Sequence, residues 1–173
     1  MDELTTALAS DLDRAFPRLV DEMGPGLYWG LRRMCGDHGE AEDLTQETFI
    51  RAYRSLLDFD RHRFAELRLG PWVWTIALNL GRNHLRSRSR RPMFVEMHGH
   101  EHPHRDPDLP DDRAWDNRFA SLNRDQRTAV VLRHVVGLGI AEISQSTGRP
   151  EGTVKADIHR GLEKLREIME QEK

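Results

Sequence analysis

The sequence has little of what several classes of protein require. Its one cysteine, Cys35, excludes a disulfide within the chain and a zinc site built from cysteines. No apolar run is long enough to span a bilayer, and the acidic, polar first residues lack the apolar stretch of a signal peptide. We therefore expect a cytoplasmic protein that does not insert into a membrane, with Cys35 as a packing residue rather than a nucleophile.

Signatures of catalysis are missing as well. The sequence contains no phosphate-binding glycine loop, no metal ligands at a helical spacing, and no pattern that pairs a nucleophile with a base. We therefore expect no catalytic residue and no cofactor, and the chain is not expected to be an enzyme on its own.

What the 173 residues do contain is helical periodicity. Hydrophobic residues make up 38% and charged residues 32% of the chain, which suits small helical cores, and no segment alternates in the manner of a β-strand. The expected fold class is all-α, with two small helical domains, residues 1–91 and 113–173, joined by a flexible linker, residues 92–112.

The expected linker differs in composition from both of its neighbours. It holds four prolines and six acidic residues against one arginine, Arg105, so it buries too little surface to fold alone and is too long for an ordinary loop. Four histidines alternate within it: His98, His100, His102 and His104. In an extended chain two or three of them would face the same way and share a metal ion. A flexible polar linker that is rich in histidine is the simpler interpretation.

The stretch 71–91, PWVWTIALNLGRNHLRSRSRR, has five arginines and no acidic residue, although the whole chain has a net charge of −3. On a helix, one face would carry polar and basic side chains: Thr75, Asn79, Arg82, Asn83, Arg86 and Arg90. The opposite face would pack inward through Val73, Ile76, Ala77 and Leu80. Arginines beside Trp72 and Trp74 suit single-stranded DNA, whose bases stack on aromatic rings while arginines follow the backbone. The alternative is that both tryptophans belong to the core and the arginines are merely solvated.

A second amphipathic helix is expected over residues 41–54, AEDLTQETFIRAYR. Its inner stripe would consist of Ile50, Tyr53 and Leu57. Its outer face is polar and charged: Asp43, Gln46, Glu47 and Arg51. Periodicity alone identifies this outer face as a solvated one.

Residues 140–167 fit a helix-turn-helix. A short helix with Ile140 and Ile143 on its inner face ends near Gly148, and Pro150 enforces the turn. A second helix runs from residue 151 or 153 to 167, with Gly161 permitting close approach beside a buried stripe of Val154, Ile158, Leu162 and Leu165. Its other side offers residues for the major groove: Thr153, Lys155, Ala156, His159 and Arg160. The alternative is a helical hairpin with a solvated polar face.

Three segments in this order resemble the sigma-70 family, in particular its short extracytoplasmic-function (ECF) type. They are AEDLTQETFIRAY (41–53), PWVWTIALNLGRNHLRSRSRR (71–91) and LNRDQRTAVVLRHVVGLGIAEISQSTGRPEGTVKADIHRGLEKLRE (122–167). The resemblance implies a dissociable initiation subunit of bacterial RNA polymerase, with a region 2-like domain (1–91) and a region 4-like domain (113–173). A stand-alone helix-turn-helix regulator is the rival interpretation, but such a regulator needs neither of the first two segments.

The resemblance also implies partners and contact residues. Core RNA polymerase would be bound through its β′ coiled coil and β flap, and an anti-sigma factor would regulate the chain. The β′ coiled coil would contact Asp43, Gln46, Glu47 and Arg51. The −10 element of promoter DNA would be bound and held open by Trp72, Trp74, Thr75, Asn79, Arg82, Asn83, Arg86, Arg88 and Arg90. The −35 element would be bound as a duplex by Glu151, Thr153, Lys155, Ala156, His159 and Arg160. Asp157 departs from the family's more basic pattern, and its charge is expected to repel phosphate.

Overall fold

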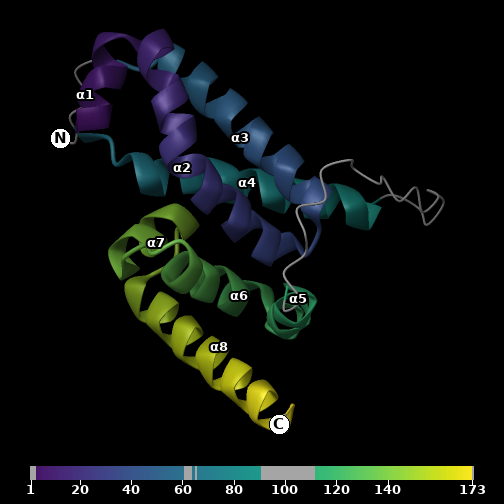
Figure 1. Cartoon of the computed structure of the whole chain (residues 1–173). Helices are drawn as coiled ribbons and strands as arrows, with labels where there is room; N and C mark the ends of the chain where they lie inside the picture. The colour runs from purple at the N-terminus through teal and green to yellow at the C-terminus, as the bar shows by residue number, and fades with distance from the viewer. Residues whose placement is uncertain (1–2, 61–63, 65, 91–111, 173) are drawn as a thin grey trace.

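The computed structural model describes residues 3–60, 64, 66–90 and 112–172, and the long elements in these ranges are all helices, as predicted (Figure 1). The elements are α1 (Glu3–Ser10), α2 (Leu12–Cys35), α3 (His38–Leu57), α4 (Leu69–Arg90), α5 (Asp112–Ala120), α6 (Arg124–Val130), the π-helical turn η2 (Val131–Val135), α7 (Ile140–Thr147) and α8 (Glu151–Gln171). Residues 91–111, with most of the expected linker and its four histidines, lie outside the described residues. No helix in the described part of the chain is long and apolar enough to cross a membrane.

Helix α2 continues through two prolines, Pro17 and Pro25. Asp11 caps its start by accepting a hydrogen bond from the backbone N–H of Arg14 (3.1 Å), and Gly36 ends it in the left-handed conformation (φ 75°). Pro17 and Pro25 both lie on the exposed side of the helix. Leu19 and Leu27, which precede and follow Pro25 on the apolar side of the helix, are fully buried. This packing outweighs the backbone hydrogen bonds that the prolines cannot donate.

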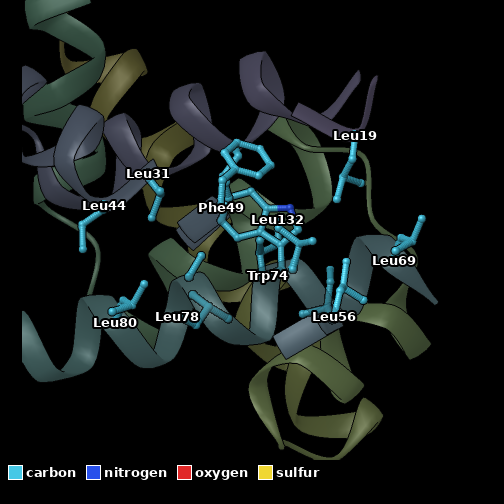
Figure 2. Close-up of a cluster of buried hydrophobic side chains, with 14 of the residues drawn as sticks. Leu19, Leu31, Leu44, Phe49, Leu56, Leu69, Trp74, Leu78, Leu80 and Leu132 are labelled. Atoms are coloured by element: carbon cyan, nitrogen blue, oxygen red, sulfur yellow. The ribbon is translucent and has the colours of Figure 1, made fainter. Parts of the chain in front are cut away.

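The buried stripe of α3 lies one residue away from the predicted one. Ile50 and Leu57 are 45% and 59% exposed and Tyr53 is only half-buried, so the predicted inner stripe is wrong. The side chains that face α2 and α4 are Ala41, Leu44, Thr48, Phe49, Ala52 and Leu56. Residues 49–50 and 56–57 are adjacent apolar pairs, so the periodicity allows either member of each pair to face the core. In the structure it is Phe49 that packs into the core (Figure 2).

The C-terminal helices follow the predicted helix-turn-helix closely. Asn123 caps α6 with a capping box to Gln126, and α7 ends at Gly148 in the left-handed conformation (φ 69°). Helix α8 starts directly after Pro150. Gly161 allows the predicted close approach, because a Cβ there would lie 2.7 Å from a methyl group of Val130. The buried stripe of α8 is confirmed at Val154, Ile158 and Leu165, while Leu162 is half-buried.

The two halves of the chain, α1–α4 and α5–α8, share one hydrophobic core. Helix α7 packs on α4 (Figure 1), and η2 is in contact with α2. Trp74 is 1% exposed and belongs to a buried cluster that also contains Leu132 and Ile143 of the C-terminal half (Figure 2). Local sequence patterns predicted two helical domains but not the contact between them.

Polar contacts join the two halves around this core. Asp116 on α5 accepts hydrogen bonds from Arg32 (2.7 Å) and Arg33 (3.0 Å) at the end of α2, and all three side chains are largely buried. Arg127 on α6 donates to the backbone carbonyl of Met34 (3.0 Å), and burial lowers its pKa. At the other end of the interface, Arg68 pairs with Glu142 (2.9 Å).

Gly30→Ala is expected to lower the free energy of unfolding by about 1–3 kcal/mol, because overpacking strains a filled core. A Cβ at residue 30 would lie 2.5 Å from Cη2 of Trp74 and 2.9 Å from a methyl group of Val136. Gly26→Ala, in the same helix, is the matched control: nothing lies within 4 Å of its Cβ, and the substitution should stabilise the helix by about 0.5–1 kcal/mol. Urea unfolding measures both variants, and equal midpoints would contradict the described packing.

Candidate nucleic-acid interface

Helix α4 contains basic residues and no acidic ones. None of its 22 residues is Asp or Glu, and the amides of Asn79 and Asn83 are exposed. Thr75 is half-buried, and its hydroxyl donates to the carbonyl of Pro71 (2.8 Å). The helix continues to Arg90, but the side chains of Arg86, Arg88 and Arg90 lie outside the described part.

The two tryptophans of α4 have different surroundings. Trp74 is a core residue that packs against Gly30 of α2, so its expected place among the DNA-contacting residues does not fit this structure. Trp72 is half-buried at the edge of the same core. Because Trp72 and Trp74 are two residues apart, their side chains point to different sides of the helix. Only the side chain of Trp74 fills the space next to Gly30.

Arg82 contacts the C-terminal half. Its guanidinium donates to the carbonyl of Thr147, the last residue of α7 (3.2 Å), and to Oδ1 of Asn79 (3.2 Å). Nearby, the hydroxyl of Ser146 donates to the carbonyl of Pro71 (3.0 Å). Part of the predicted DNA surface of α4 is thus occupied by the helix-turn-helix half.

The outer face of α3 combines charged and apolar side chains. Asp43, Gln46 and Arg51 are exposed as predicted, and the half-buried Glu47 pairs with Arg51 (2.6 Å). Ile50 lies exposed among them, and Leu57 follows two turns later. Sequence reasoning missed these two residues because it placed them in the core.

The predicted −35 residues lie in the first three turns of α8. Glu151, Lys155, His159 and Arg160 are exposed, while Thr153 and Ala156 are half-buried. Asp157 is 5% exposed and forms an ion pair with Arg149 (2.6 Å), so the expectation that its charge faces phosphate is wrong. Within the described ranges, no group of three or more His, Cys, Asp or Glu side chains is placed to hold a metal ion.

A cavity of about 260 Å³ lies between the two halves, and Cys35 lines it together with Leu78 of α4 and Ala129 of α6. The thiol of Cys35 donates to the carbonyl of Leu31 (2.8 Å), and burial raises its pKa to about 11. A thiol with this pKa is protonated near neutral pH and a poor nucleophile, which agrees with the predicted packing role.

Comparisons with known proteins match both halves of the chain to one family. The models for "Sigma-70 region 2" and "Sigma-70, region 4" match residues 19–91 and 112–165. The ECF RNA polymerase sigma factor SigW of Bacillus subtilis (strain 168) is 34% identical over 169 residues, which cover 88% of this chain and 87% of SigW. The RNA polymerase sigma factor CarQ of Myxococcus xanthus is 33% identical over 90% of this chain and 89% of CarQ.

A solved structure shares the fold. CnrH, solved in complex with the cytosolic domain of CnrY, superposes with a TM-score of 0.76 at 24% identity, over 98% of this chain and 97% of CnrH. Because the family models match both halves of the chain and SigW is similar over nearly its whole length, the chain belongs to the ECF group of the sigma-70 family of RNA polymerase initiation factors.

Proposed function

We propose that this chain binds core RNA polymerase through α3, binds and opens the −10 element with α4, and binds the −35 element with α8. The observation that carries the proposal is the composition and exposure of α4. In a chain of net charge −3, this helix has no acidic residue and exposes two amides, Asn79 and Asn83. Such a surface suits a polyanion whose bases are accessible.

The polymerase contact falls on the outer face of α3. It combines Asp43, Gln46, Glu47 and Arg51 with the exposed side chain of Ile50. Protein interfaces place apolar side chains at their centre and polar ones around them, and Ile50 has charged neighbours of this kind. The coiled coil of the β′ subunit is the proposed partner, and the β flap is the proposed partner of the second half.

Strand opening needs no ATP in this proposal. An asparagine amide both donates and accepts hydrogen bonds, so Asn79 and Asn83 are able to bind the edge of an unpaired base. Capture of a flipped base offsets the few kcal/mol that unstacking costs. Trp72, the tryptophan of α4 that keeps some exposure, is the remaining aromatic platform, and stacking contributes about 1–3 kcal/mol per base.

The first turns of α8 would enter the major groove at the −35 element. Lys155 and Thr153 suit phosphates, and Arg160 suits guanine. Membership of the ECF group also makes an anti-sigma factor a proposed partner.

Contact with both promoter elements requires the two halves to separate. The elements lie about 25 base pairs apart, or about 85 Å at 3.4 Å per pair. A compact chain of this length has a radius of gyration of only about 16 Å. Opening would break the pairs between Asp116 and the arginines of α2, and it would release Arg82 from Thr147.

The wild-type chain is expected to bind purified core polymerase and to direct transcripts from specific promoters. Ile50→Asp should weaken core binding at least about tenfold, or about 1.4 kcal/mol, because a charge would enter an apolar contact. Met169→Asp, 39% exposed at the far end of α8, is the control and should bind normally. Fluorescence titration measures both, and a wild-type chain that neither binds core nor directs transcripts would sink the proposal.

Asn79→Ala and Asn83→Ala are each expected to reduce strand opening about fivefold, the equivalent of one lost hydrogen bond of about 1 kcal/mol. Core binding should not change. The measurement is the chemical reactivity of unpaired thymines in the promoter complex. Asn117→Ala, an exposed amide on α5, is the control. Normal opening by both α4 variants would remove these amides from the −10 surface.

Asp116→Lys is expected to open the free chain. The substitution places a third cation beside Arg32 and Arg33, and loss of one partner from a largely buried ion pair costs about 3–5 kcal/mol. Small-angle X-ray scattering should show a larger radius of gyration than for the wild type. Asp21→Lys, with the same charge change at an exposed site on α2, should leave the radius unchanged. Equal radii for the two variants would contradict the role of Asp116.

A further inference from the structure

Asp157 is an unusual residue for the DNA-facing half of a recognition helix. Its side chain is buried, although Lys155, His159 and Arg160 around it are exposed. A carboxylate is costly to bury unless cations and hydrogen-bond donors compensate its charge. In this structure two guanidinium groups do so, one on each carboxylate oxygen.

The first guanidinium belongs to the turn. Oδ2 of Asp157 lies 2.6 Å from Nη1 of Arg149, the residue that precedes Pro150 between α7 and α8. Arg149 also pairs with Asp125 in the first turn of α6 (3.3 Å), and its carbonyl accepts a hydrogen bond from the hydroxyl of Ser144 (2.6 Å). Through Arg149, the carboxylate of Asp157 is held in place by two other helices.

The second guanidinium belongs to a residue that faces outward. Nη2 of Arg160 donates to Oδ1 of Asp157 (3.3 Å), one turn earlier on α8, while Nε of Arg160 donates to the carbonyl of Ala156 (3.3 Å). The side chain of Arg160 is nevertheless 59% exposed. Its position is therefore restrained from the protein side, while much of its surface remains open to a ligand.

We propose that Asp157 is a positioning residue for Arg160, and that it directs this arginine to one guanine of the −35 element. The inference rests on the proposed function of α8. A guanidinium reads guanine through two parallel hydrogen bonds to O6 and N7, which demand a defined orientation. Without the carboxylate, the same cation would be free to contact phosphates, which carry no direct sequence information. Asp157 thus contributes base preference rather than overall affinity.

The test uses the complete chain assembled with core polymerase on a promoter library randomised across the −35 element. The wild type should prefer guanine at one position, and Arg160→Ala should abolish that preference and so identify the position. Asp157→Asn should lower the preference for guanine there about tenfold, while binding of the other promoters is unchanged or tighter. The double variant should lose no more preference than Arg160→Ala alone, because both substitutions act on one contact.

A matched variant separates positioning from folding. Arg149→Gln breaks the ion pair with the turn but leaves Arg160 its carboxylate, so it should lower the melting temperature and keep more of the preference for guanine than Asp157→Asn does. If Arg149→Gln does not fold, Asp125→Asn, which loosens the same turn, takes its place.

The outcomes distinguish this inference from the function on which it rests. No promoter-specific transcript from the wild type would mean that the proposed function has failed. A working wild type whose base preference survives Asp157→Asn would overturn the inference, and so would equal loss of preference in the Asp157 and Arg149 variants.

Discussion

The burial of Trp74 is the constraint on which the rest of the structure depends. Its indole fills the space above Gly30, where a single added carbon would collide with it, and Val136 of the other half closes the same site. Since consecutive residues of a helix are rotated by about 100°, burying Trp74 turns Asn83 almost directly outward and Asn79 nearly so. The same side chain thus joins the two halves and orients the amides of α4.

Local signals were enough to predict the helices and the helix-turn-helix, because Gly148, Pro150 and Asn123 act on neighbouring backbone. They were not enough wherever two apolar residues stand side by side. Either Phe49 or Ile50 satisfies the periodicity of α3, and only the shape of the surrounding core excludes Ile50. In the same way, no local pattern relates residues 30, 74 and 136, so the shared core was not predictable and the sequence did not decide between the two places considered for Trp74.

For the candidate surfaces, sequence reasoning succeeded with residues that the core does not need. The exposure of Asn79, Lys155 and His159 follows from helical spacing alone. It failed for Asp157, because a single acidic residue on a recognition helix looks exposed until its cations are known. Those cations come from the turn and from the next turn of α8, and only the folded chain brings them together.

Two of the polar contacts between the halves are weaker than the buried ion pairs of Asp116. Arg82 and Arg127 both donate to carbonyls in the last turns of helices, where the partial negative charge of the helix end attracts a cation only weakly. The cavity beneath them holds the chain's one thiol. Because residues of the C-terminal half help to bury Cys35, separation of the halves would hydrate the thiol and bring its pKa down toward that of a free cysteine. If the halves separate as proposed, the rate at which Cys35 is alkylated would therefore increase with that separation.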